Sequence, residues 1–222
     1  MTSKALPWTY YDVKLKIDRI VGGLPVRDDL ILAWQEAHWR KHPPLPGDPA
    51  TPEEAARLTK ALVTHAADVV DDEQNSWTTF PRDEDGYLCI ETRCIKAMLK
   101  ESANILRKLV KADGAGNYLR ARLAERVFVP GRLIPFEPRT TEPHASPERP
   151  IHVMTAMGPR DALKRADELH GVSLSVRLKV LDDGMFTVDV LSALLDHASE
   201  NGLGADRSQG AGTFAFTIEA AD

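Results

Sequence analysis

The amino-acid sequence predicts an α+β protein in which helices cover one face of an antiparallel sheet. Three segments alternate apolar and polar residues with a period of two, and two others carry apolar residues at the helical spacing of 3.6. Because each alternating segment has only one apolar face, the sheet should be open on its other side. The order of the segments along the chain predicts a β-α-β-β-α-β core.

The expected strands begin and end the core. The alternating segments are residues 11–17, 172–180 and 213–219. A fourth strand is expected within residues 125–134, where a Pro-Gly pair interrupts an apolar run. Proline and glycine within such a run indicate an edge strand or a bulge.

The two expected helices span residues 93–111 and about 188–200. The first carries basic side chains opposite its apolar face and ends before Asp113-Gly114, and the second ends at Asn201-Gly202. Glycine and asparagine are common just beyond the last turn of a helix, because they adopt the left-handed conformation easily. Both helices should bury their apolar faces against the sheet.

A single domain of 222 residues is expected, with two insertions in its core. The core comprises residues 8–20, 87–134 and 171–220, and the insertions are residues 21–86 and 135–170. Their proline content is incompatible with central strands or with long uninterrupted helices.

The first insertion should be largely helical, and the second should resemble a thumb projecting from the core. Within the first, helices are expected at residues 28–41 and 51–70, on either side of a proline-rich link. Within the second, an irregular stretch at residues 135–150 precedes a short strand at 151–157 and a helix at 160–170.

The overall charge argues against a protein that coats nucleic acid through uniform positive charge. The chain carries 28 basic and 33 acidic side chains, a formal net charge of −5. Residues 93–132, however, hold 10 basic and only 3 acidic side chains, a net charge of +7 between flanks of −6 each. Such an asymmetry indicates either a polyanion-binding surface or the solvated face of a helix.

A cytoplasmic protein is expected, because we find no apolar run of membrane-spanning length and no signal-peptide pattern at the N-terminus. Cys89 and Cys94 fit a reducing compartment, and their spacing is poor for zinc, so we interpret them as small buried side chains. We expect no metal ion and no cofactor.

A glycine-rich segment at residues 202–212 is the most informative local pattern. Four glycines in eleven residues allow positive φ and close approach of another backbone, while Arg207, Ser208 and Gln209 add hydrogen-bond donors for phosphate or sugar oxygens. It lacks the Gly-Lys-Ser/Thr of a phosphate-binding loop and precedes a strand, where a dinucleotide fingerprint would open a helix. A structural turn remains the alternative.

Three blocks together resemble the RAMP superfamily, the RRM-like proteins of CRISPR effector complexes. They are the loop GLGADRSQGAGTFAF, the segment GYLCIETRCIKAMLKESANIL at residues 86–106, and the opening strand YYDVKLKIDRI followed by Gly22-Gly23. The blocks occur in the family's order and cover roughly a third of the chain. The family pattern has glycine where this chain has Ala97, and basic residues where it has Asp206.

The resemblance is nearest to the backbone subunits that polymerise along CRISPR RNA in antiviral defence. It implies a ferredoxin-like, RRM-like fold, association with copies of the chain and with other effector subunits, and RNA contacts by the first helix, the glycine-rich loop and a thumb. The residues at the matching positions are Arg93, Lys96, Lys100, Gly204, Arg207, Ser208 and Gly210.

The residues themselves suggest further contacts on the open face of the sheet and along the basic stripe of the first helix. Conventional RRM domains stack bases on strand aromatics, and that aromatic-rich motif is absent here, so we expect backbone contacts rather than base stacking. Binding should then be independent of sequence and sensitive to salt. The added candidates are Lys14, Lys16, Arg107, Arg177, Lys179 and Gln209.

The sequence therefore predicts a protein that binds single-stranded RNA, with DNA as the alternative, and that associates with itself. A ribonuclease is the second hypothesis, because acidic clusters can hold a divalent cation and histidines can transfer protons. No residue is singled out as catalytic. The third hypothesis is a protein-interaction module that has lost nucleic-acid binding, which Asp206 favours. The groups considered for catalysis are Asp68, Asp71, Asp72 and Glu73, then Asp83, Glu84 and Asp85, and His38, His42 and His65.

Overall fold

The computed structural model describes residues 7–25, 51, 53, 75–110, 118–155 and 158–221. The chain divides into two compact units, and each contains a sheet of its own. Unit 1 comprises Met1–Ile20, Cys89–Thr140 and His170–Asp222, and unit 2 comprises Val21–Leu88 and Thr141–Leu169. The expected single domain with two insertions stays a prediction.

Unit 1 contains a four-stranded sheet in the order β10-β1-β9-β5. The strands are β1 (Trp8–Val21), β5 (Val127–Phe128), β9 (Glu168–Leu181) and β10 (Phe214–Ala221). β1 pairs antiparallel with β10, and β5 pairs antiparallel with β9. A helix follows β1 and a second helix follows β9, which gives the β-α-β-β-α-β order of a ferredoxin-like fold. The predicted α+β class is confirmed.

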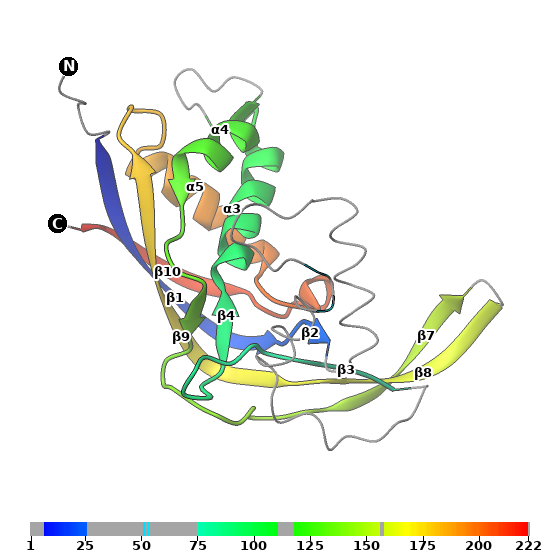
Figure 1. Ribbon diagram of the computed structural model, residues 1–222. Helices are drawn as coiled ribbons and strands as arrows, with labels where there is room; N and C mark the ends of the chain where they lie inside the picture. The colour runs from blue at the N-terminus through cyan, green and yellow to red at the C-terminus, as the bar shows by residue number, and fades with distance from the viewer. Residues whose placement is uncertain are drawn as a thin grey trace. The chain divides into compact units, whose positions relative to one another are not determined.

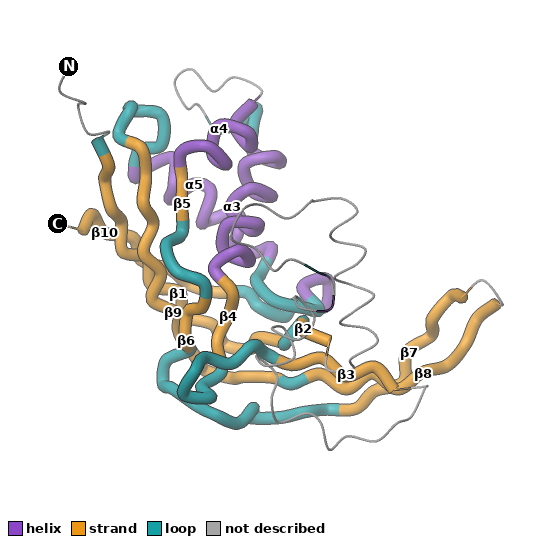
Figure 2. The backbone as a smooth tube through the Cα atoms, viewed as in Figure 1, coloured by secondary structure: helices purple, strands orange, loops and turns teal. Residues whose placement is uncertain are grey.

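Helices α3 (Thr92–Leu106) and α5 (Val188–Asn201) lie on one side of this sheet (Figures 1 and 2). The apolar positions of the alternating strands face them, because successive side chains of a strand point to opposite faces. α5 begins close to the predicted position, at a threonine cap where the backbone N–H of Val190 donates to the Thr187 hydroxyl at 3.4 Å. The buried positions that form this core include Val13, Leu15, Ile17, Leu174, Val176, Leu178, Ile95, Leu99, Leu191 and Leu194.

Two features of unit 1 differ from the prediction. The first helix ends at Leu106, earlier than expected, and Leu109 beyond it is 77% exposed. The apolar run at residues 125–134 forms two short strands, β5 and β6 (Leu133–Pro135), because a Pro-Gly turn with positive φ at Gly131 divides it. β6 pairs antiparallel with β4 (Cys89–Glu91).

A short helix, α4 (Leu119–Arg126), was not predicted from the sequence. Its only buried side chains are Leu119 and Leu123, four residues apart on one face. Two apolar positions are too few to establish a helical period, so its stability comes from packing in the folded unit.

Unit 2 contains a second four-stranded sheet in the order β2-β3-β8-β7. The strands are β2 (Leu24–Pro25), β3 (Asn75–Thr79), β7 (Glu148–Thr155) and β8 (Gly158–Ala166). The strand expected at residues 151–157 is thus present and begins earlier. β7 is at the edge of the sheet, where the missing N–H of Pro150 is tolerated.

The prediction of a helix at residues 160–170 is wrong. β8 and the start of β9 occupy this stretch, and β8 pairs antiparallel with β7 from Glu148↔Arg165 to Thr155↔Gly158. On its other side β8 pairs parallel with β3. Hydrogen bonds to two neighbouring strands therefore override a helical spacing of apolar residues that is visible in the isolated segment.

Asp167 connects the elements of unit 2. This carboxylate is 4% exposed and accepts hydrogen bonds from the Thr79 hydroxyl at 2.5 Å, the Ser146 hydroxyl at 2.6 Å and the Trp77 indole N–H at 3.2 Å. Its backbone carbonyl accepts from the Gly22 N–H at 2.9 Å. A Cβ at Gly22 would lie 2.5 Å from the carbonyl carbon of Thr79, so only glycine permits this approach.

The helices expected at residues 28–41 and 51–70 lie outside the described residues, apart from Thr51 and Glu53. In the part of the chain that is described, no helix is long and apolar enough to cross a membrane.

Candidate nucleic-acid interface

The glycine-rich loop at residues 202–212 joins α5 to β10 and is held closely to β1. The N–H of Leu203 donates to the carbonyl of Gly212 at 2.9 Å, and the N–H of Gly212 donates to the carbonyl of Arg19 at 2.8 Å. Gly212 has φ +80°, and a Cβ there would lie 1.8 Å from the Leu203 carbonyl oxygen. The glycines at the base of the loop therefore close it against the sheet.

The tip of the loop is an exposed single turn, η2 (Arg207–Gln209). It is flanked by two left-handed residues, Asp206 with φ 56° and Gly210 with φ 78°. The Gln209 N–H donates to the Asp206 carbonyl at 2.9 Å, and Gly204 before the turn has φ +89°. The aspartate that departs from the family pattern thus takes a conformation that suits Asp or Asn better than most side chains.

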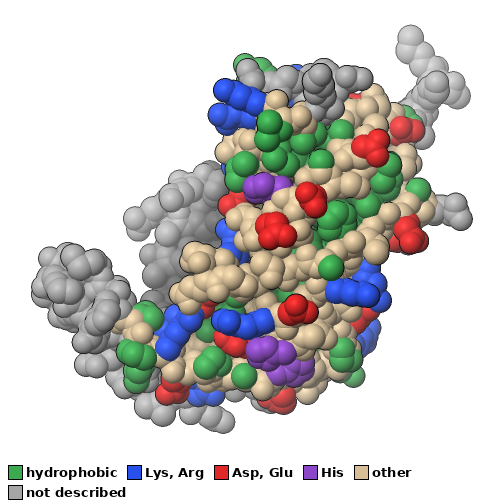
Figure 3. All heavy atoms as spheres, turned by 180° about the vertical axis from the view of Figure 1, so that it is seen from behind, with side chains coloured by type: hydrophobic (Ala, Val, Ile, Leu, Met, Phe, Trp, Pro, Cys, Tyr) green, Lys and Arg blue, Asp and Glu red, His purple; other side chains and the backbone are tan. Residues whose placement is uncertain are grey.

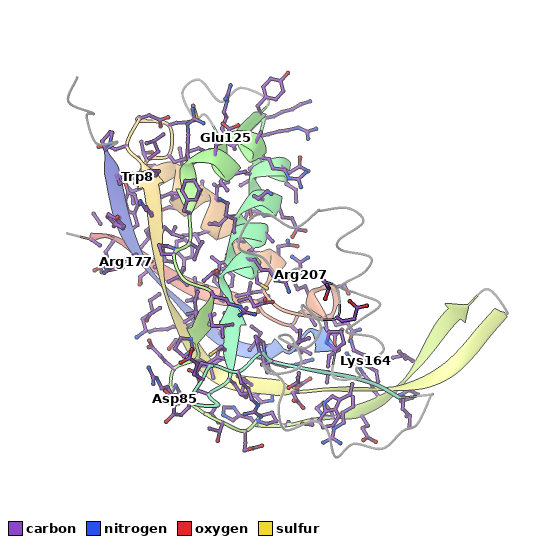
Figure 4. The ribbon with its side chains drawn as sticks, in the orientation of Figure 1. Trp8, Asp85, Glu125, Lys164, Arg177 and Arg207 are labelled. Carbon is purple, nitrogen blue, oxygen red and sulfur yellow. The ribbon has the colours of Figure 1, made fainter. Side chains whose placement is uncertain are left out.

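An ion pair joins the loop to α3. Nη1 of Arg207 lies 2.7 Å from Oε2 of Glu101, and both side chains are more than a third exposed (Figure 4 shows Arg207). The hydrogen bond from Arg207 is the main cause that lowers the pKa of Glu101. Lys100 lies beside Glu101 on the same helix. We call Arg207, Ser208, Gln209, Glu101 and Lys100 the loop–helix group.

The other candidate cations of α3 already have partners within unit 1. Nε of Arg93 donates to Glu91 at 2.8 Å, and Nη1 of Arg107 donates to the Asn104 amide oxygen at 3.2 Å. Nζ of Lys96 donates to the Ala124 carbonyl at 2.8 Å. Burial, and then the charge of Lys100, lower the pKa of Lys96.

The open face of the sheet carries a second set of candidates. Arg177 on β9 binds Asp12 on β1 through two hydrogen bonds, of 2.8 and 2.9 Å (Figure 4). The hydrogen bond from Arg177 is also the main cause that lowers the pKa of Asp12. Nζ of Lys14 lies 3.7 Å from Glu137, and Lys16 is exposed on the same face.

Most of the predicted residues therefore lie in the glycine-rich loop, at Lys100 beside it in the loop–helix group, or on the open sheet face. Arg93, Lys96 and Arg107 instead contact partners elsewhere in unit 1. In the described part of the chain, Lys16, Lys100 and Lys179 have no carboxylate partner within 4 Å. The three arginines Arg93, Arg177 and Arg207 do have one. Figure 3 shows one face of the molecule, on which Lys and Arg side chains are scattered with acidic side chains between them.

The acidic cluster at Asp83–Asp85 stabilises a turn. Oδ1 of Asp83 accepts hydrogen bonds from the backbone N–H groups of Asp85 at 3.1 Å and Tyr87 at 2.8 Å. Among the described residues, no three His, Cys, Asp or Glu side chains come together as a metal site. The cluster at residues 68–73, and His38, His42 and His65, lie outside the described residues.

The sequence predicted the basic residues of the site but not the acidic residues that pair with them. Glu101 belongs to the same helix as the basic stripe, but nothing in the sequence pairs it with Arg207. A histidine was also overlooked: Nδ1 of His197 lies 3.1 Å from the buried Ser102 hydroxyl. His197 lines an open hollow of about 570 Å³ between the end of α3 and α5, together with Leu106, Val110, Ala193, Asp196, Glu200 and Asn201.

Comparison with known proteins gives a structural likeness but no match to a family model or to a curated protein. A solved chain described as "Cryo-EM structure of the Type III-B Cmr-beta bound to cognate target RNA" superposes with a TM-score of 0.48 and 15% identity. The alignment covers 97% of this chain and 61% of that chain. A likeness at this level assigns the chain neither a family nor a function.

Proposed function

We propose that unit 1 binds single-stranded RNA along its sugar–phosphate backbone, without sequence specificity. The observation that carries the proposal is the 2.7 Å contact between Arg207 and Glu101, because it makes the glycine-rich loop and α3 neighbours. These are two of the elements that the sequence resemblance implies as RNA contacts. The exposed loop tip adds hydroxyl and amide donors from Ser208 and Gln209.

Phosphate binding at the loop–helix group involves an exchange of partners. A phosphate can take the guanidinium of Arg207 from Glu101, since both offer oxygens to the same planar donors. Lys100 precedes Glu101 on α3 and has no carboxylate partner within 4 Å among the described residues, so its charge is available without displacing one. Backbone recognition of this kind reads charge and geometry, and so tolerates any base.

The test is the binding of labelled single strands of about 12 nucleotides, with several RNA and DNA sequences, between about 50 and 200 mM salt. Fluorescence anisotropy should give similar affinities for unrelated sequences and a log–log salt slope near −2 to −3, the value for about three or four phosphates. RNA and DNA strands of one sequence, compared directly, decide which nucleic acid is preferred. The strand should be recovered intact on a gel.

Two variants and a control locate the contact. Lys100→Ala and Arg207→Ala should each weaken binding and reduce the salt slope by about 0.7. Lys108→Ala removes an equal charge just beyond the end of α3 and should change neither quantity. An affinity that is the same in all four proteins would refute a contact at the loop–helix group.

We also propose that copies of the chain associate along a strand, and with other effector subunits, as the resemblance implies. The support is electrostatic: the flanks of the sequence carry −6 each and the central segment +7, which favours a heterologous contact between unlike surfaces. Light scattering after size-exclusion chromatography, with and without a long RNA, tests this. A monomer under both conditions would overturn it.

A further inference from the structure

An aromatic pair flanked by two lysines lies at one edge of the sheet in unit 1. The ring of Trp8, at the start of β1, and the ring of Phe128 on β5 form an edge-to-face pair, with 5.8 Å between centroids and 78° between planes. Nζ of Lys179 lies 4.5 Å above the Trp8 ring, and Nζ of Lys96 lies 4.3 Å above the Phe128 ring. We call these four residues the Trp8–Phe128 cluster.

The two rings and Lys179 belong to the open face of the sheet, and Lys96 reaches the Phe128 ring from α3. Trp8 has the same parity as the exposed Asp12 and Lys16 of β1, and Phe128 is the register partner of Lys179 on β9. Phe128 remains 39% exposed, and Trp8 is half-buried. A side chain that served only the core would be covered by the helices, as Val127 next to it is.

At least one aromatic face remains for a ligand. An edge-to-face pair engages the face of only one of its rings. Each ammonium covers one face of the ring beneath it. The ring that contributes only its edge to the pair therefore keeps one face that neither a lysine nor the other ring covers. Phe128, which is 39% exposed, is the more exposed of the two rings.

The chemistry around the rings favours an anionic, planar ligand. In the described part of the chain, neither Lys96 nor Lys179 has a carboxylate partner within 4 Å. Each ammonium lies over a ring, and that of Lys96 also donates to the Ala124 carbonyl at 2.8 Å. An ammonium on a flexible stem can turn from the ring toward a phosphate at small cost. Every base of a single strand has a face that stacks and a phosphate on either side.

We propose that the Trp8–Phe128 cluster is a stacking site for one unpaired base of a single-stranded nucleic acid, with Lys96 and Lys179 contacting the adjacent phosphates. This rests on the proposed function and deepens it. It also departs from the sequence expectation that bases do not stack on this sheet: the aromatic motif of conventional RRM strands is absent, but two rings distant in sequence supply a platform. Stacking of this kind is tolerant of base identity.

The experiment compares two probes that share their phosphates and differ in their bases. One is a short oligonucleotide of a single pyrimidine, and the other is the same strand with abasic residues at every position. Wild-type protein should bind the pyrimidine strand about 5- to 100-fold more tightly, which is the contribution expected from one stacked base. Phe128→Leu keeps apolar bulk and should lose most of this preference, while Phe128→Tyr should retain it.

Tyr118→Leu is the matched control, because Tyr118 is an aromatic side chain 70% exposed at the start of α4. This variant should bind both probes as the wild type does. Thermal unfolding of Phe128→Leu, compared with wild type, checks that the fold is retained. Trp8→Leu provides a second measurement. The pyrimidine strand should quench the tryptophan fluorescence of this variant less than that of the wild type.

The outcomes separate the two proposals. Equal affinity of wild type for both probes, with a salt-dependent Kd, would leave backbone binding standing and overturn the stacking site. A base preference that survives in Phe128→Leu and Trp8→Leu would also overturn it. If wild-type protein bound neither probe at low salt, the proposed function would be refuted and the stacking site with it.

Discussion

Replacing Gly212 by alanine should collapse the geometry of the glycine-rich loop, whereas the same change at Gly210 should not. The two glycines have nearly equal backbone conformations, with φ of +80° and +78°. A Cβ at Gly212 would lie 1.8 Å from the Leu203 carbonyl oxygen, 1.2 Å inside the 3.0 Å limit of observed contacts, while a Cβ at Gly210 meets nothing within 4 Å. Conformational strain is therefore common to both variants, and the clash is specific to Gly212→Ala.

The difference can be estimated from the contacts. The positive φ costs alanine about 1–2 kcal/mol at either position. Relieving the clash at Gly212 also breaks the hydrogen bonds to Leu203 and Arg19, at about 1–1.5 kcal/mol each, so Gly212→Ala should cost about 3–5 kcal/mol in total. Differential scanning calorimetry should show a Tm decrease of about 6–20 °C for Gly212→Ala and about 2–8 °C for Gly210→Ala.

Anisotropy with a short RNA should show binding lost in Gly212→Ala at a temperature where calorimetry finds the protein folded. Equal Tm values for the two variants would refute the loop geometry. A folded Gly212→Ala that bound RNA normally would refute the role of that geometry in binding.

Three further perturbations test particular residues. Glu101→Gln releases Arg207 and should tighten RNA binding about two- to five-fold at low salt, whereas Glu84→Gln, an equal change of charge in unit 2, should have a smaller effect. Asp167→Ala leaves three donors without their acceptor, one of them the buried Thr79 hydroxyl, and should lower the free energy of unfolding by about 2–5 kcal/mol in urea, and Asp167→Asn by less. The hydrogen bond from its arginine partner holds the pKa of Asp12 below the ordinary 3.8, so its stabilisation is present above that pH and is lost as pH falls through the lowered value. The Tm advantage of wild type over Asp12→Asn at neutral pH should accordingly decrease on acidification and vanish once the Asp12 carboxylate is protonated. An advantage that grew on acidification would contradict the assignment.

The fold of unit 1 was predictable because its strands and helices carry strong, unmixed periods. Alternation over residues 11–17 and 172–180 survives in β1 and β9, and the helical spacing at 188–200 survives in α5. Each of these segments buries one face against the same core, so local pattern and tertiary environment agree. The side chains of β8 do not alternate between apolar and polar residues, so its backbone pairing with β7 and β3 could not be predicted from their spacing.

The basic residues of the candidate site could be predicted from the sequence, and the acidic residues that pair with them could not. Counting charges along the chain locates a basic segment, but ion pairs are formed across the fold. Asp12 lies 165 residues from Arg177, and Glu101 lies 106 residues from Arg207. The aromatic pair was missed for the same reason, since Trp8 and Phe128 share no local pattern.

These pairings limit how tightly one copy of the chain can bind. A phosphate that replaces Asp12 or Glu101 on an arginine exchanges one charge-assisted hydrogen bond for another, so its net gain is small. Lysines without carboxylate partners, and a stacked base, therefore have to supply most of the affinity. If copies also align along one strand, their weak contacts add within a single complex, and affinity should increase steeply with strand length. A Kd that is unchanged between strands spanning one site and several would exclude such alignment, and would leave an isolated, weakly binding chain.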